Sequence, residues 1–200
     1  MNQHSEDLTQ RYYEDKAEEY LARTSHLDME SLYKPFLELI PAGGTILDAG
    51  CGPGRDTLSF LKKDFQITAF DASAKMVELA SKQTGVAAFQ MRFQELNYEQ
   101  EFDGIWACAS LLHVPFCELD DIISRFSRAL KTGGICFMSF KNGNGERFDD
   151  GRRYIDFTEA TLRQKLADIS GLSILRIWGT EDQAGRNGVQ WVNALVRSER

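Results

Sequence analysis

Residues 46–55 read Ile-Leu-Asp-Ala-Gly-Cys-Gly-Pro-Gly-Arg, and this stretch decides the fold. The apolar residues at its start predict a short buried strand, and Arg55 begins an amphipathic segment that predicts a helix. Gly50, Gly52 and Gly54 lie at the turn between them. Glycine lets the backbone approach a ligand closely, and a helix that begins at such a turn offers N–H donors. The stretch therefore predicts a strand, a ligand-binding turn and a helix in succession.

Apolar runs and helical patterns alternate outward from this turn. Seven strands are predicted, at residues 45–49, 66–70, 86–91, 104–109, 135–140, 172–178 and 189–196. Helices are predicted at 55–62, 75–83, 118–130 and 158–169, and two helical stretches precede residue 41. Alternation of strands and helices is typical of a parallel sheet covered on both faces. We expect a doubly wound, mostly parallel seven-stranded α/β sheet of the Rossmann-like type, which ends in an antiparallel hairpin.

The composition excludes several classes of protein. The 200 residues are 42% hydrophobic and 26% charged, which is typical of a globular domain. The 23 basic and 30 acidic residues give a net charge of −7, which argues against a nucleic-acid partner or an anionic membrane surface. No apolar run approaches the ~18 residues of a membrane span. Because the start is polar and the four cysteines lack metal-ligand spacing, we expect a cytoplasmic protein with reduced thiols and no metal site.

The order of residues around the turn separates the ligands that it can bind. A nicotinamide fingerprint needs a glycine where Arg55 stands, and the phosphate-loop pattern GxxxxGK[ST] is absent. Asp48 lies two residues before the first glycine, where a carboxylate suits an ammonium group and repels a pyrophosphate. Asp71 ends the next strand, 21 residues after Gly50, and its two oxygens can accept the hydroxyls of a ribose. A ligand with an amino-acid end and an adenosine end satisfies both acids, and S-adenosylmethionine is such a ligand.

Four segments carry a resemblance to a known family. ILDAGCGPGR, FDAS at 70–73, FDGIWACASLLH at 102–113 and LKTGG at 130–134 resemble the class I S-adenosylmethionine-dependent methyltransferases. The resemblance covers residues 12–140 well and the remainder more loosely. Within that superfamily the chain is most similar to small bacterial enzymes described as tellurite-resistance-related or general small-molecule methyltransferases.

The resemblance implies a cofactor site at the carboxyl ends of the strands. The glycine turn would lie beneath the methionine moiety, Asp48 near its ammonium group, directly or through a water, and Asp71 at the ribose. At the adenine edge, family members often have an acid and this chain has Arg92. The N-terminal helix would cover the cofactor, and Tyr13 or Tyr20 would contact the sulfonium by cation–π attraction. The implied cofactor residues are Tyr13, Asp48, Gly50, Cys51, Gly52, Gly54, Arg55, Asp71, Ala72, Ser73, Met76, Phe93, Gln94, Ala109 and Ser110.

The whole chain, residues 1–200, is expected to form one methyltransferase domain, because it shows no repeat, low-complexity tract or linker. Residues 1–41 are predicted as an N-terminal helical lid and 42–140 as the cofactor-binding core. Residues 141–200 are predicted to supply a substrate-side loop, a helix and the hairpin. Within them, residues 141–157 are polar and lack an apolar pattern, and a loop of this length in a compact domain predicts a functional lid.

Three residues are candidates for the chemistry. His113 follows the fourth strand, near the expected acceptor, where a neutral imidazole either takes a proton from the acceptor or only lines the pocket. A thiol or a metalloid anion as acceptor would need no base. Arg152 and Arg153 either clamp an anionic substrate or form a solvated cluster with nearby aspartates.

We expect methyl transfer from S-adenosylmethionine to a small-molecule acceptor by in-line displacement, with S-adenosylhomocysteine as the second product. The protein is expected to be a monomer or homodimer that binds neither nucleic acid nor membrane. The alternatives are a cofactor-binding regulatory module without turnover, a methyltransferase for a protein or RNA, and a nicotinamide-dependent dehydrogenase. The absence of an Asn/Asp-Pro-Pro-Tyr signature and of a Pro-Cys pair disfavours transfer to amide, adenine or cytosine groups.

Overall fold

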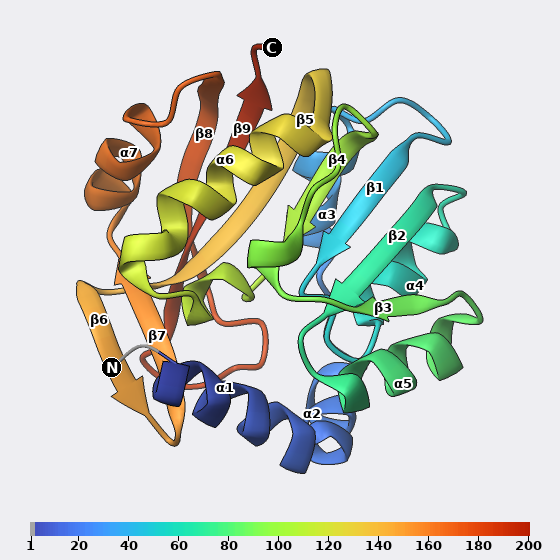
Figure 1. Ribbon diagram of the computed structural model, residues 1–200, viewed down its shortest axis with the longest axis vertical. Coiled ribbons are helices and arrows are strands. Elements are labelled where there is room, and N and C mark those ends of the chain that lie inside the picture. The colour runs from blue at the N-terminus through green and yellow to red at the C-terminus, as the bar shows by residue number, and fades with distance from the viewer. Residues whose placement is uncertain (1–2) are drawn as a thin grey trace.

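In the computed structural model, which describes residues 3–200, nine strands form one sheet that helices cover on both faces (Figure 1). The first two residues of the predicted lid lie outside this range. The strands are β1 (Thr45–Ala49), β2 (Gln66–Asp71), β3 (Ala88–Gln90), β4 (Phe102–Ala107), β5 (Leu130–Asn142), β6 (Gly145–Asp149), β7 (Arg152–Phe157), β8 (Leu172–Glu181) and β9 (Gln190–Ser198). The helices are α1 (Gln3–Asp15), α2 (Ala17–Thr24), α3 (Glu30–Leu37), α4 (Arg55–Leu61), α5 (Ala74–Thr84), α6 (Leu119–Ala129) and α7 (Glu159–Ala167).

The parallel part of the sheet has the order β3-β2-β1-β4-β5. β9 then pairs antiparallel with β5, and β8 pairs antiparallel with β9. The predicted doubly wound fold with a closing hairpin is confirmed. From β1 the chain continues to β2 and β3 on one side of β1, and then crosses to β4 on its other side. The loops that follow β1 and β4 therefore run in opposite directions and leave a crevice between them.

Two apolar cores lie on opposite faces of the sheet. α6 and α7 lie in front of it in the view of Figure 1, where Ile122, Phe126 and Leu162 are fully buried. α3 and α4 contribute to the core on the other face, where Trp106 stacks on Phe137 with ring centroids 4.0 Å apart. The apolar stripe of α6, spaced three and four residues apart, is what makes that helix pack on the sheet.

The prediction of seven strands was wrong, because residues 141–157 form a hairpin in place of a structureless lid. β6 and β7 pair antiparallel, with Asp149 opposite Arg152. The two residues between them, Asp150 and Gly151, have φ of +50° and +73°. Asp-Gly with positive φ at both positions is the favoured two-residue hairpin turn, and the surrounding charges hid this signal in the sequence.

The hairpin occupies the space beyond the end of β4. Lys141 on β5 pairs with Trp191 of β9 on one side and with Asp156 of β7 on the other. The pairing of β4 with β5 ends at Met138. Beyond that residue, β7 pairs with the same edge of β5. β7 thus lies at the carboxyl edge of the sheet, close to α1 (Figure 1).

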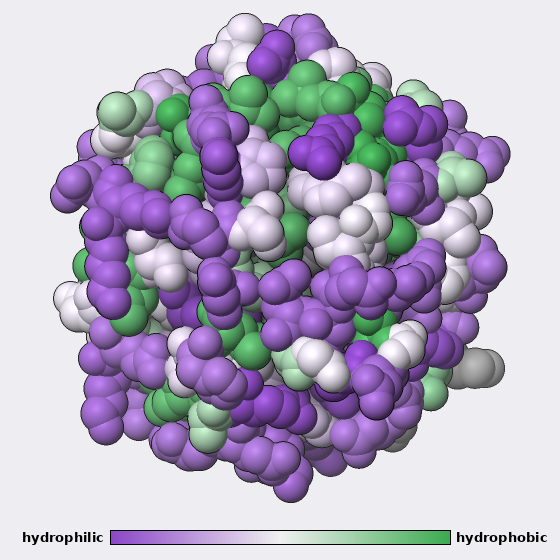
Figure 2. Space-filling view, turned by 180° about the vertical axis from the view of Figure 1, so that it is seen from behind, coloured by the Kyte–Doolittle hydropathy of each residue, from purple (hydrophilic) through white to green (hydrophobic). Residues whose placement is uncertain are grey.

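On the face of the molecule opposite to that in Figure 1, apolar and hydrophilic residues are unevenly distributed. Figure 2 shows apolar residues gathered over its upper part and hydrophilic residues over the middle and lower part. The lower part is the end where α1 and α2 lie in Figure 1. Among the described residues, no helix combines the length and the apolar character that crossing a membrane requires.

Candidate active site

The first cavity lies at the carboxyl ends of β1, β2 and β4, where ligands bind in sheets of this order. Its volume is about 160 Å³, and residues of α1 and α2 line one side of it. Of the residues predicted to contact a cofactor, all but Asp48 and Gly54 line it. Those that do are Tyr13, Gly50, Cys51, Gly52, Arg55, Asp71, Ala72, Ser73, Met76, Phe93, Gln94, Ala109 and Ser110.

The turn after β1 is shaped by close packing and by backbone hydrogen bonds. Gly50 has φ +78°, and a Cβ atom there would lie 2.5 Å from the Cβ atom of Ser110. The amide N–H groups of Gly50 and Cys51 both donate to the carbonyl oxygen of Phe70, at 2.9 Å. These two amides are engaged within the protein, so the turn offers a ligand a surface that no side chain blocks.

Asp71, at the end of β2, joins the two turns that border the cavity. Its Oδ2 accepts a hydrogen bond from the amide of Gly52, and its Oδ1 accepts one from the amide of Ser73, each at 2.9 Å. Burial raises the pKa of Asp71, and these backbone N–H groups act against that rise. Each carboxylate oxygen keeps a second lone pair, so Asp71 can still accept two hydroxyl groups from the cavity.

Gly54 and Asp48, which the resemblance assigns to the cofactor, do not line the cavity. Gly54 has φ +91°, and a Cβ atom there would come within 3.0 Å of the Cα atom of Ala80, so this glycine allows α4 to pack on α5. Asp48 is 2% exposed, and its Oδ2 accepts from the hydroxyl of Thr57 at 2.5 Å. Burial, and after it the charge of Asp56, raise the pKa of Asp48 to about 8.

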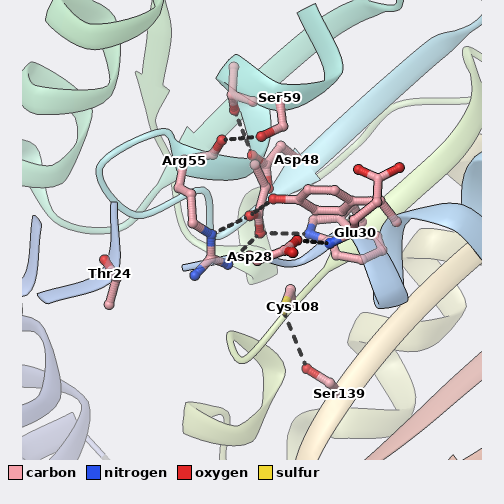
Figure 3. A network of polar contacts seen from close by, with 12 residues as sticks. Thr24, Asp28, Glu30, Asp48, Arg55, Ser59, Cys108 and Ser139 are labelled. Atoms are coloured by element: carbon pink, nitrogen blue, oxygen red, sulfur yellow. Dashed lines mark hydrogen bonds and ion pairs between the residues drawn. The ribbon is translucent and has the colours of Figure 1, made fainter. Parts of the chain in front are cut away.

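The carboxylate that does line this side of the cavity is Asp56, which no spacing in the sequence singles out. Arg55 donates to it through Nε at 2.6 Å and through Nη2 at 2.9 Å. The hydroxyl of Tyr33 and the indole N–H of Trp106 also donate to it, at 2.6 and 2.8 Å. Figure 3 shows Arg55 reaching into this network. Burial raises the pKa of Asp56, but the Arg55 charge and the hydrogen bonds outweigh it, so the pKa lies below its usual value and the group stays ionised.

Polar contacts to the start of α5 hold α1 over the cavity. Gln10 donates through Nε2 to the carbonyl oxygen of Ala72 at 3.0 Å. Glu14 accepts from the amide of Ala74 at 2.6 Å and from the amide of Lys75 at 3.1 Å. A carboxylate on the first amides of a helix is stabilised both by hydrogen bonds and by the helix dipole. Glu14 is therefore the group that fastens α1 to the cavity rim.

The turn after β3 borders the same cavity. Arg92 lines it, and its Nη2 donates to Oε1 of Gln10 at 3.0 Å. Gln94 donates through Nε2 to Glu118 at 2.7 Å, which fixes its amide. Phe93 packs edge-on against Phe70, with ring centroids 5.5 Å apart. An arginine thus stands on the wall where family members often have an acid.

A second cavity of about 110 Å³ adjoins the first. β5, β7, β9 and the loop after β8 form its walls. The two cavities share part of their lining, and this shared part is called the junction below. The junction residues are Tyr13, Tyr20, Thr24, Arg55, Cys108, Ala109 and His113. A ligand in the first cavity and a ligand in the second cavity would come into contact at this junction.

His113 has both ring nitrogens engaged. Its Nδ1 lies 2.6 Å from the carbonyl oxygen of Arg153, and its Nε2 lies 2.7 Å from the hydroxyl of Tyr13. Because a carbonyl only accepts, Nδ1 carries the proton, and the Tyr13 hydroxyl donates to Nε2. Burial lowers the pKa of His113 to about 3; the Arg153 carbonyl acts against this, and the charges of Arg152 and Lys141 add to it. The imidazole is neutral, and its lone pair points at Tyr13.

The end of β4 carries a strained residue. Ala109 has φ +53°, and its amide donates to the hydroxyl of Ser139 at 2.8 Å. Such a conformation costs a non-glycine residue about 1–3 kcal/mol and is frequent at functional sites. Ser110 donates to the carbonyl oxygen of Ala49 at 2.7 Å, which ties this turn to the glycine turn. Burial raises the pKa of Cys108 to about 12, so this junction thiol stays protonated and is no nucleophile.

The two predicted substrate arginines point to different surroundings. Arg152 lines the second cavity, whereas Arg153 is 6% exposed, bonds Glu146 through Nη1 at 2.7 Å and lies over the ring of Phe148. Successive side chains of a strand point to opposite faces, so neighbours on β7 do not share a pocket. Lys141, Tyr154 and Trp191 are among the wall residues of the second cavity that were not predicted from the sequence as site residues.

Comparison with known proteins agrees with this geometry. Residues 46–134 match the model of the methyltransferase domain family. A ubiquinone biosynthesis O-methyltransferase of Xanthomonas axonopodis pv. citri (strain 306) is 32% identical over 111 residues, which are 52% of this chain and 46% of that enzyme. This chain therefore spans about half the length of that relative.

Solved structures share the fold. The 1,6-didemethyltoxoflavin-N1-methyltransferase of Burkholderia thailandensis, which holds its substrate and S-adenosylhomocysteine, superimposes with a TM-score of 0.77 at 22% identity, over 95% of this chain and 85% of that one. The magnesium protoporphyrin IX methyltransferase of Synechocystis PCC 6803, with S-adenosylhomocysteine bound, gives 0.75 at 17% identity, over 97% and 99%. Residues 46–134 thus match a methyltransferase domain, and the whole chain has the fold of these solved methyltransferase structures, with a cavity at the glycine turn.

Proposed function

We propose that this chain transfers a methyl group from S-adenosylmethionine, held in the first cavity, to a small molecule held in the second. The observation that carries the proposal is the junction, where the walls of both cavities include the same seven residues. When bound, the donor supplies an electrophilic methyl group together with its own leaving group. The protein then mainly has to hold the acceptor in line with that methyl group and exclude water, which can contribute about 7–11 kcal/mol.

The residues of the first cavity suit the donor. The bare backbone at Gly50 leaves room for the methionine chain, and the free lone pairs of Asp71 suit the two ribose hydroxyls. For the ammonium group, the ionised Asp56 is a better partner than Asp48, which is buried behind the turn. The rings of Tyr13 and Tyr20, packed edge to face at 5.5 Å, stand at the junction, where they suit a sulfonium.

We propose that His113 positions Tyr13 rather than acting as the base. An imidazole with a pKa of about 3 is a weak proton acceptor near neutral pH, and its lone pair already accepts from the tyrosine. The bond between them links α1 to the turn after β4, which are 100 residues apart in the chain. In this proposal α1 and α2 cover the donor, and residues 141–200 supply the acceptor side.

The proposal is tested by calorimetric titration with S-adenosylhomocysteine and with NADH. We expect S-adenosylhomocysteine to bind, NADH not to bind, and Asp71→Ala to weaken S-adenosylhomocysteine binding about tenfold or more. Asp168→Ala, which removes an exposed carboxylate at the end of α7, is the matched control and should leave binding unchanged. Binding of NADH alone would refute the proposal.

We further propose a cytoplasmic protein that acts without nucleic acid. Two observations support this: the net charge of −7, and the thiols of Cys51, Cys108 and Cys136, which form no disulfide among the described residues. Gel filtration with light scattering would distinguish a monomer from a homodimer.

A further inference from the structure

We infer that the methyl acceptor carries an oxyanion, such as a carboxylate, which Lys141 and Arg152 bind in the second cavity while its nucleophilic atom lies at the junction. The inference rests on the proposed function, because it assigns the acceptor of the same site. It differs from the sequence-based expectation, which paired Arg152 with Arg153.

Lys141 is a half-buried cation with no carboxylate partner in the part of the chain that the structure describes. Among the described residues it forms no ion pair, and its Nζ lies 3.9 Å from the ring centroid of Tyr154. Burial lowers the pKa of Lys141, and the charges of Arg147, Arg186 and Arg152 lower it further, against Asp156, which raises it. A cation in such surroundings is stabilised when an anion binds beside it.

Arg152 stands in the same wall with unused hydrogen-bonding capacity. Its side chain is 14% exposed, and its Nε is buried without a hydrogen-bond partner among the described residues. A carboxylate bonded to it, that of Asp150, is 3.3 Å away and 68% exposed. The guanidinium carbon lies 3.9 Å from the ring centroid of Tyr12, which holds the fork in place. A guanidinium fixed in this way is suited to a carboxylate or a phosphate.

Two other cations in or near this wall, Arg186 and Arg147, are already paired with carboxylates. Arg186 bonds Asp182 at 2.6 Å, and Asp182 also accepts from the indole N–H of Trp191 at 2.8 Å. Arg147, behind Tyr154, bonds Asp156 at 2.5 Å.

Three charged wall residues remain to be counted. Arg55 is held by Asp56 at 2.6 Å, and Arg23 lies over the ring of Tyr20. Glu181 is an acid in the same wall, and its Oε1 accepts from Gln190 at 3.3 Å. Lys141, Arg152 and Arg23 against Glu181 leave the wall with an excess of positive charge.

The position of these groups also orients the acceptor. Lys141 and Arg152 line the second cavity beside the junction, and Arg152 bonds the hydroxyl of Tyr13, so an anion bound to them leaves the rest of the acceptor next to the junction at Tyr13 and Cys108. The anchored oxyanion is then not the atom that is methylated, and the product keeps its negative charge.

The test uses the full-length protein, a methyl-labelled donor and a bacterial small-molecule extract. Labelled products are separated by anion exchange at pH 8, where a retained label marks an anionic product. We expect the label in the retained fraction, and we expect Lys141→Met and Arg152→Met each to raise KM for that acceptor about tenfold or more, with kcat less affected. In both variants the affinity for S-adenosylhomocysteine should stay at the parent value. Lys141→Arg, which keeps the positive charge, should have a KM much closer to that of the parent than Lys141→Met.

The matched control is Arg176→Met, which removes a cation that lies over Trp178 at 4.5 Å outside both cavities, and it should leave KM unchanged. A labelled product that is neutral or cationic, or a KM that neither substitution moves, would overturn the inference and leave the proposed function intact. Binding of S-adenosylhomocysteine without any labelled product would instead count against methyl transfer itself.

Discussion

Gly50→Ala tests whether the glycine turn is fixed by packing on the turn after β4. The substitution has two costs. A residue with a Cβ atom at φ +78° loses about 1–2 kcal/mol relative to glycine. The new Cβ atom would also lie 2.5 Å from the Cβ atom of Ser110, so one turn must move. That movement breaks the 2.7 Å hydrogen bond from Ser110 to Ala49, at a cost of about 1–3 kcal/mol.

The expected loss in the free energy of unfolding is therefore about 2–5 kcal/mol. For a chain of this size each kcal/mol lowers Tm by about 2–4 °C. Urea denaturation followed by circular dichroism measures the loss, and calorimetry measures the accompanying fall in S-adenosylhomocysteine affinity. Gly133→Ala is the matched control, because Gly133 has φ +77° and no atom within 4 Å of the position that a Cβ atom would take. It should show the backbone cost alone.

A double-mutant cycle separates the two costs of Gly50→Ala. Ser110→Gly removes the atom that the new Cβ would meet, so adding Gly50→Ala to it should cost only the backbone part. We expect a coupling free energy of about 1–3 kcal/mol between the two sites. Additive effects, or a Gly50→Ala variant no less stable than Gly133→Ala, would refute the packing argument.

Three further predictions concern protonation and closure. Asp48, with a folded pKa of about 8 and an ordinary value near 4, holds a proton in the folded chain that the unfolded chain releases, so ligand-free stability falls as pH rises between about 4 and 8. Asp48→Asn should therefore gain stability over the parent from pH 5 to pH 8, and an advantage that shrinks over this range contradicts the assignment. Glu14→Ala should speed S-adenosylhomocysteine dissociation about fivefold in stopped flow, because α1 loses its cap on α5, whereas Glu18→Ala, at an exposed position of α2, should not. Because the pKa of His113 is lowered to about 3, the pH profile of kcat/KM should show no inflection between pH 6 and 7. An inflection in this range that disappears in His113→Asn would show that the imidazole acts as the base.

Local chemistry made much of the fold readable from the sequence. Apolar periodicity located the parallel strands and α6, and the glycine turn with a carboxylate at the next strand end located the first cavity. These signals depend on residues within one turn or one strand, so no tertiary information is needed to read them. The Asp150-Gly151 pair is also a sequence signal for a two-residue hairpin turn. The charged residues beside it obscure the alternation of apolar and polar residues by which β7 would be predicted as a strand.

Only the tertiary structure decided which side chains face the cavities. Asp48 and Asp56 are both acids near the glycine turn, and their directions follow from how α4 packs on the sheet. The bond between Tyr13 and His113, like the pairing of β5 with β7 that brings Lys141 to Arg152, joins segments far apart in the chain. A residue's spacing fixes which face of its own element it occupies, but what that face meets depends on the register and packing of other elements, and those are set by the whole core.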